Sequence, residues 1–159
     1  MSLNVKSPTI VEGHPIPVAH TEDGENLSPA LSWTAQPKGT VSLTLIVDDP
    51  DAPGEEEWVH WILMNVPGSF TALPAGFHEL NLPPEAPEGM VQGINSWGTL
   101  GYRGPAPPVG HGLHHYHFKL YALDSKLDAP AGIKKHDLLG LLSGHILARG
   151  ELVGTYRRD

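Results

Sequence analysis

Two segments of the sequence each place a histidine on an apolar strand beside a proline-rich turn. Residues 48–53 read Asp-Asp-Pro-Asp-Ala-Pro and lead to residues 58–61, Trp-Val-His-Trp. Residues 104–108 read Gly-Pro-Ala-Pro-Pro and lead to residues 113–116, Leu-His-His-Tyr. A single histidine on such a strand is most often a core residue that bonds a backbone carbonyl. Two of them beside rigid turns indicate the walls of one small polar pocket.

The side chains of this predicted pocket suit an anion. The imidazoles of His60 and His114 and the hydroxyl of Tyr116 are hydrogen-bond donors for a phosphate or carboxylate. Tyr116 follows His114 by two residues, so both lie on one strand face. Asp49 would orient one imidazole, that of His60 if the two lie close, and favour its charged form. Trp58 shares the strand face of His60 and would shield the site from water.

Two further aspartates flank the first turn. Asp48 and Asp51 lie where a strand runs into the proline turn. Aspartates in such turns commonly accept hydrogen bonds from nearby backbone amides. We therefore predict that Asp48 and Asp51 shape the turn, whereas Asp49 belongs to the pocket.

Other kinds of site find less support in the sequence. His111, His114, His115 and His117 form a cluster, and His115 and His117 share a strand face in a spacing that zinc can use. There is no HExxH motif, no cysteine and no obvious third ligand on that face, so we expect neither a metal nor another cofactor. Residues 98–104 are glycine-rich but lack the lysine of a phosphate-binding loop, and no GxSxG motif marks a serine hydrolase.

Three predicted strands position the pocket residues. Residues 41–48 alternate in side-chain direction, as a strand does. Residues 58–66 are apolar on both faces, which is typical of a central strand, and alternation places on one face Trp58, His60, Ile62 and Met64. Residues 114–123 form the third strand and carry His114 and Tyr116 on one face.

The remaining sequence predicts short elements. Residues 1–40 are rich in turns, and residues 67–100 form a long irregular stretch that is either functional or contains short strands. Apolar residues at helical spacing predict a helix over 136–148, and a final strand follows over 151–157. No repeat or linker divides the chain, so we predict one mostly β domain of the α+β class over residues 1–159.

Composition restricts the partners. The formal net charge is −8, which argues against a nucleic-acid partner, because a phosphate backbone requires a surface rich in lysine and arginine. The basic pairs Lys134-Lys135 and Arg157-Arg158 are typical of solvated ends, so an anion must be held locally. The absence of cysteine excludes disulfides. No apolar run could span a bilayer and the first residues do not resemble a signal peptide, so we expect a cytoplasmic protein without a transmembrane segment.

Several motifs in a fixed order resemble those of the phosphatidylethanolamine-binding proteins. They comprise residues 26–33 (Asn-Leu-Ser-Pro-Ala-Leu-Ser-Trp), 49–53, 58–61 and 104–116. The likeness extends from about residue 20 to Tyr156 and is closest to the bacterial and archaeal branch, which is called Raf-kinase-inhibitor-like.

The resemblance implies a large antiparallel sheet packed on a smaller one, with one or two short C-terminal helices. It also implies a pocket for a small anion such as phosphate, acetate, cacodylate or a phospholipid head group. The family's pocket residues fall on Asp49, Trp58, His60, Pro107, Pro108, His114 and Tyr116. A cis peptide near the first turn, with Ala52–Pro53 as the candidate, and a homodimer are further expectations from the resemblance.

We therefore expect a non-enzymatic binding protein for a ligand that bears a phosphate or carboxylate. One alternative is an inhibitor or scaffold of a protease or kinase, whose phosphorylated side chain or terminus the pocket would hold. Another is a phosphoester-processing enzyme with His60 or His114 as general base, although no nucleophile is evident. If the histidines supply positive charge, affinity for the anion falls as the pH rises through their pKa values.

Overall fold

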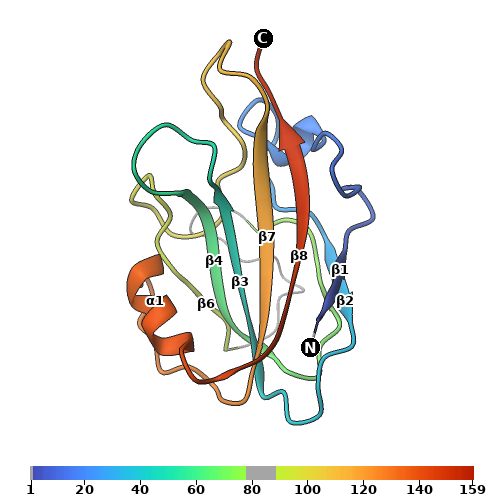
Figure 1. The fold of residues 1–159 in the computed structure, drawn as a ribbon, viewed down its shortest axis with the longest axis vertical. Coiled ribbons are helices and arrows are strands. Elements are labelled where there is room, and N and C mark those ends of the chain that lie inside the picture. The colour runs from blue at the N-terminus through green and yellow to red at the C-terminus, as the bar shows by residue number, and fades with distance from the viewer. Residues whose placement is uncertain (1, 78–88) are drawn as a thin grey trace.

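Two antiparallel sheets make up most of the fold (Figure 1). The computed structural model describes residues 2–77 and 89–159. The larger sheet has the strand order β6-β4-β3-β7-β8, with the bounds β3 (Ser42–Asp49), β4 (Trp58–Pro67), β6 (Val91–Gln92), β7 (His114–Leu123) and β8 (Ile146–Tyr156). The smaller sheet has the order β1-β2-β5, with the bounds β1 (Asn4–Lys6), β2 (Leu31–Thr34) and β5 (Ala72–Leu73). The predicted β-rich fold, a large sheet packed on a smaller one, is confirmed.

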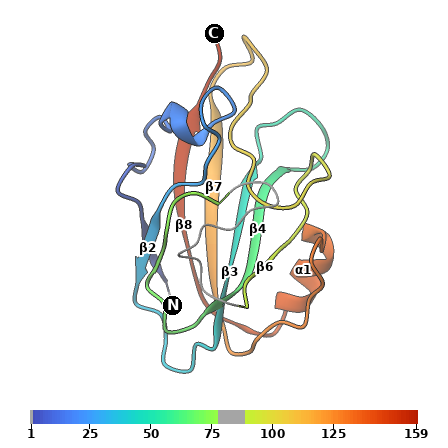
Figure 2. The same cartoon turned by 180° about the vertical axis from the view of Figure 1, so that it is seen from behind.

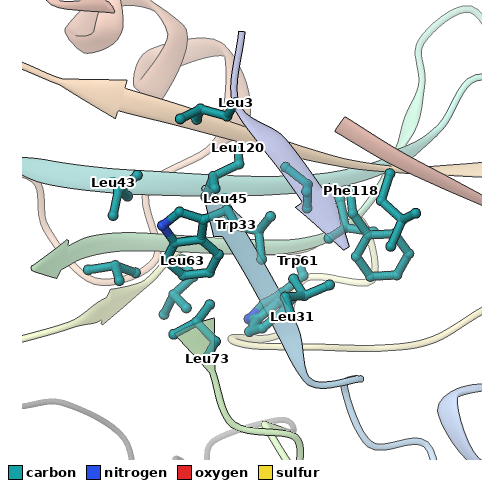
Figure 3. Close-up of a cluster of buried hydrophobic side chains, with 14 of the residues drawn as sticks. Leu3, Leu31, Trp33, Leu43, Leu45, Trp61, Leu63, Leu73, Phe118 and Leu120 are labelled. Carbon is teal, nitrogen blue, oxygen red and sulfur yellow. The ribbon is translucent and has the colours of Figure 1, made fainter. Parts of the chain in front are cut away.

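The smaller sheet covers one face of the larger sheet. Leu31 and Trp33 of β2 belong to the same buried apolar cluster as Leu45 of β3, Leu63 of β4 and Leu120 of β7 (Figure 3). Alternate residues of the long strands supply this cluster because successive side chains of a strand point to opposite faces. The main core therefore lies between the two sheets.

The helix α1 (Lys135–Leu142) covers part of the opposite face, and Figure 2 shows it on the side of the molecule away from β2. Leu138 and Leu142 pack with Ile46 of β3 and Ile62 of β4 in a second apolar cluster. Apolar residues thus lie on both faces of β3 and β4, and all eight residues of β3 are buried.

The predicted helix over 136–148 is too long. The helix ends at Leu142, and Gly144 follows with a positive φ of 84°, a conformation that commonly stops helices. Ile146 then begins β8, so the final strand starts five residues before its predicted position at 151. The apolar residues keep their helical spacing across this turn, so the spacing alone did not show that a strand replaces the helix there.

The long strands lie close to their predicted positions. β7 has the predicted bounds, β3 is shifted by one residue at both ends, and β4 is one residue longer than predicted. The irregular stretch predicted over 67–100 contains the short strands β5 and β6, and its part over 78–88 lies outside the described residues.

A β-bulge in β4 decides where His60 points. β3 pairs Val47 with Trp61 and Asp48 with Val59, so His60 is an extra residue between two paired positions. A bulge interrupts the alternation of a strand and re-aims the side chain of the extra residue.

The bulge turns His60 toward the side of the larger sheet that faces the smaller sheet. The ring of His60 lies edge-on against Tyr116, with ring centroids 5.1 Å apart, and Tyr116 belongs to the core on that side. Ile62 and Met64 instead pack in the second cluster, under α1. The predicted common face of His60 with Ile62 and Met64 is therefore wrong, because the alternation breaks at the bulge.

Three connecting segments meet at one end of the larger sheet, the top in Figure 1. They are residues 50–57 after β3, the segment before β7, and the region of the short 3-10 helix η1 (Val18–His20). The strand ends that carry the pocket residues lie at this same end.

Candidate functional site

A cavity of about 400 Å³ lies at this end of the larger sheet. The seven residues predicted from the sequence all line it, namely Asp49, Trp58, His60, Pro107, Pro108, His114 and Tyr116. The structure adds six residues that sequence reasoning did not select, namely Glu22, Ala52, Pro53, Trp97, Ala106 and Arg158. Strand ends and proline turns far apart in the sequence thus form one cavity, and the role of these residues in ligand binding stays a prediction.

His60 is clamped by the backbone of Arg103. Its Nδ1 lies 2.7 Å from the carbonyl oxygen of Arg103, and the backbone N–H of Arg103 donates to the carbonyl of His60 at 3.0 Å. A carbonyl oxygen only accepts, so Nδ1 of His60 carries the proton. Burial lowers the pKa of His60, and the imidazole is therefore neutral at pH 7. The predicted role of His60 as a cationic donor does not agree with this geometry.

His114 is held at both ring nitrogens. Its Nδ1 lies 2.6 Å from Oδ2 of Asp49, and its Nε2 lies 2.6 Å from Nδ1 of His111. Asp49 and His114 are both buried, whereas His111 is exposed. Asp49 therefore orients His114 and not His60, its first predicted partner. The chain Asp49–His114–His111 links a buried carboxylate to solvent, and His111 was not predicted to take part in the pocket.

Aromatic rings form the wall of the cavity around His60. Trp97 lies edge-on to His60 and to Trp58, with centroid distances of 5.0 and 5.4 Å. The hydroxyl of Tyr116 has no hydrogen-bond partner in the part of the chain that the structure describes, although the residue is 1% exposed. Burial raises the pKa of Tyr116, so this hydroxyl keeps its proton and remains a donor.

Arg158 provides the cavity with a guanidinium group. Two of its nitrogens donate to the carboxylate of Asp23, at 3.0 and 2.7 Å, and this ion pair lowers the pKa of Asp23. Its Nη1 lies 3.5 Å from the carbonyl oxygen of Pro107 in the proline turn. The sequence shows the basic pair Arg157-Arg158 just after the last strand, but nothing in the pattern distinguished Arg158 as the inward residue.

Hydrogen bonds fix the second proline turn against the region of η1. The side chain of Asn26 accepts from the N–H of Gly104 at 2.7 Å, and the N–H of Glu22 donates to Pro105 at 3.1 Å. A Cβ atom on Gly104 would lie 2.0 Å from the carbonyl oxygen of His20, so only glycine fits this approach. The turn is thus held in place before any ligand arrives.

The first turn is closed by Asp49, because its Oδ1 accepts from the N–H of Asp51 at 2.8 Å. Asp51 in turn accepts from the N–H and Nδ1 of His115. Asp48, predicted to shape the turn, instead points under α1 and pairs with lysines. The Ala52–Pro53 peptide, expected to be cis, is trans, which is the more stable form of most X–Pro bonds.

Within the described residues, no group of three or more His, Asp or Glu side chains converges as a metal site would require. His115 and His117 each bond an acidic partner, Asp51 and Glu151 respectively. No helix in residues 2–77 and 89–159 is long and apolar enough to cross a membrane.

Comparison with known proteins gives the family. The family profile of the phosphatidylethanolamine-binding proteins matches residues 6–157. A UPF0098 protein of Methanothermobacter thermautotrophicus is 47% identical over 158 residues, which cover 98% of this chain and 99% of the relative. The chain therefore belongs to the phosphatidylethanolamine-binding protein family.

Two solved structures share its fold over almost their entire length. YbcL of Escherichia coli, described as a member of the mammalian PEBP family, superposes with a TM-score of 0.92, is 32% identical and is covered in full, as is this chain. The PEBP homologue CT736 of Chlamydia trachomatis gives a TM-score of 0.87 at 37% identity, with 99% of each chain covered.

Proposed function

We propose that this protein is a non-enzymatic binding protein that holds a small phosphate- or carboxylate-bearing ligand in the cavity. One observation carries the proposal. The same cavity is lined by the Tyr116 hydroxyl, which has no hydrogen-bond partner among the described residues, and by the Arg158 guanidinium. Both groups can donate hydrogen bonds, so an oxyanion, whose oxygens accept them, complements this part of the lining. The net charge of −8 repels anions overall, which makes such a local arrangement necessary.

The lining favours binding over turnover. The described residues that line the cavity include no serine, threonine or lysine that could act as a nucleophile. His114 has both ring nitrogens in hydrogen bonds, so it offers no free base to a substrate. His60 has only Nδ1 bonded, and the lining offers its Nε2 none of these nucleophiles to activate. The rigid wall of Trp58, Pro107 and Pro108 would exclude water and strengthen each hydrogen bond to the ligand.

Calorimetric titration with inorganic phosphate and with phosphoethanolamine tests the proposal. We expect Arg158→Ala to weaken binding about tenfold to a hundredfold, because a hydrogen bond to a charged group contributes about 1.5–3 kcal/mol. Tyr116→Phe removes one neutral donor and should weaken binding about threefold to tenfold. Arg157→Ala is the matched control, because Arg157 is exposed and pairs with Asp159 away from the cavity. Equal affinity of all four proteins would place the ligand elsewhere.

We also propose that the protein forms a homodimer and that it lies in the cytoplasm. Light scattering of the purified protein tests the first, and fractionation of cells that produce it tests the second.

A further inference from the structure

The structure shows which nitrogen of His60 meets the cavity. Nδ1 is bonded to Arg103, and the ring is only 3% exposed although it lines the cavity. Within the described residues, the fully buried side-chain atoms without a partner are Thr44 Oγ1 and Asp48 Oδ1. Nε2 of His60 has no hydrogen-bond partner among these residues and is not one of the fully buried atoms. It is therefore exposed to the cavity that His60 lines.

This nitrogen is an acceptor. With the proton fixed on Nδ1 by the carbonyl of Arg103, the neutral ring presents a lone pair at Nε2. Burial lowers the pKa of His60, and this outweighs the opposing influence of nearby groups. The charged and titratable groups that face His60 or share its cavity are Asp49 of β3, His114 and Tyr116 of β7, Glu22, Arg103 and Arg158, and Asp48 acts on it from the opposite face of β3.

We propose that the cavity selects an oxyanion that still carries a proton, and that its P–OH group donates to Nε2 of His60. The charged oxygens of the same ion accept from Arg158 and Tyr116 on the other walls. The ligand class is then inorganic phosphate or a singly protonated phosphomonoester. The inference rests on the proposed anion-binding function and adds to it the protonation state of the ligand.

Sulfate distinguishes this arrangement from simple charge attraction. Sulfate has the shape of phosphate but no proton near neutral pH, so its oxygen would face the lone pair of His60 without a hydrogen bond. An unmatched buried acceptor costs enough to lower affinity by about tenfold or more. A cavity that selected by charge alone would bind the two ions alike.

A phosphomonoester provides a second, independent test through pH. Methyl phosphate loses its last proton near pH 6, whereas inorganic phosphate keeps one proton above that pH. Methyl phosphate should therefore lose affinity as the pH rises through about 6, and inorganic phosphate should not. Sulfate does not ionise in this range, so the pH dependence of its binding measures the titration of the protein's own groups and corrects for it.

The experiment is calorimetric titration of the full chain with phosphate, sulfate and methyl phosphate at about pH 5, 6.5 and 8, which bracket the phosphomonoester pKa. We expect phosphate to bind at least about tenfold more tightly than sulfate. In His60→Gln the side-chain amide can turn its NH₂ toward the ion, so the two affinities should approach each other. His117→Gln is the matched control, because His117 pairs with Glu151 on the opposite face of β7, and it should keep the wild-type ratio.

The outcomes separate this inference from the function on which it rests. Equal or tighter binding of sulfate by the wild type, or methyl phosphate affinity that is unchanged by pH after the sulfate correction, overturns the inference and leaves anion binding intact. Binding of none of the three ions overturns the proposed function for phosphate-bearing ligands, and the inference falls with it. The wild-type titrations decide the matter even if His60→Gln does not fold.

Discussion

Asp48 and Asp49 are neighbours on β3 and both are buried, yet they point to opposite faces of the larger sheet. Asp48 lies on the α1 side, where Oδ2 accepts from the ammonium groups of Lys119 and Lys135 at 3.0 and 2.8 Å. Asp49 lies at the cavity and accepts from the imidazole of His114 at 2.6 Å. One carboxylate meets permanent cations, and the other meets a group whose protons can be redistributed.

The different partners of the two aspartates indicate different roles, with Asp48 stabilising the fold and Asp49 belonging to the cavity. Lysine keeps its charge over the physiological range, so the pair of Asp48 with Lys135 ties α1 to the sheet throughout that range. A neutral histidine can carry its proton on either ring nitrogen, so the hydrogen bonds on the Asp49 side of β3 can rearrange around a ligand. The same residue type, one position apart, thus serves the fold on one face and the cavity on the other.

The largest expected effect is on the α1 side. Asp48→Ala should lower the free energy of unfolding by about 3 kcal/mol, the lower end of the range for breaking a buried ion pair, because both lysines are part exposed and keep some water. Urea unfolding of the wild type and of Asp48→Ala measures this difference in the free energy of unfolding. Asp124→Asn is the control, since its exposed pair with His145 should contribute at most about 1 kcal/mol. A loss of phosphate affinity in folded Asp48→Ala would contradict the assignment of Asp48 to the fold alone.

Sequence reasoning found most of the cavity because the relevant signals are local. Alternation in residues 114–123 gave β7 and placed His114 and Tyr116 on one face, as the structure has them. The bulge at His60 and the direction of Asp48 escaped prediction, because both depend on the register of β3 with β4. Arg158 escaped for a similar reason, since its place in the lining results from the packing of distant segments.

The sequence predicted the positions of the cavity residues better than it predicted their hydrogen-bond partners. Asp49 was expected beside His60, but Asp49 lies 2.6 Å from His114, on the other neighbouring strand. Period-two patterns tell which face a side chain occupies and do not tell which of two adjacent strands supplies its partner. The tautomer of His60 likewise depended on the carbonyl of Arg103, 43 residues away in the chain.

A smaller effect is expected from acid on the cavity side. The pKa of His60 is lowered in the folded state, so as the pH falls below about 6.5 the unfolded chain takes up the proton first. The free energy of unfolding then decreases, by at most about 1.4 kcal/mol per pH unit for one group, until the pH reaches the folded-state pKa. The contribution is present above the unfolded pKa.

Urea unfolding at about pH 7 and 5.5, on either side of the histidine pKa, checks this sign. His60→Gln should lose less stability than the wild type between the two values, because glutamine does not titrate. His145→Gln, on an exposed imidazole that pairs with Asp124, should follow the wild type. A parallel decline of the wild type and His60→Gln would show that His60 is not the acid-sensitive group of the cavity.

The smallest expected effect on stability comes from Asp49→Asn, which changes two hydrogen bonds beside the cavity. Oδ1 of Asp49 accepts from the N–H of Asp51 at 2.8 Å, and Oδ2 accepts from Nδ1 of His114 at 2.6 Å. Asp49→Asn leaves one acceptor oxygen for two donors. The backbone N–H of Asp51 cannot change, so the NH₂ group faces His114, whose proton moves to Nε2 beside His111. We expect a loss of about 1 kcal/mol in the free energy of unfolding.

Nitrogen-15 NMR of the imidazoles reads this change directly, because protonated and unprotonated ring nitrogens have distinct shifts. Asp51→Asn is the control: one oxygen of Asp51 accepts both bonds from His115, so an asparagine can keep them and the tautomer should not change. If the proton of His114 stays on Nδ1 in Asp49→Asn, then Asp49 does not set the tautomer of its partner. Asp49 would then be a fixed charge like Asp48, and the contrast between the two faces of β3 would be one of location alone.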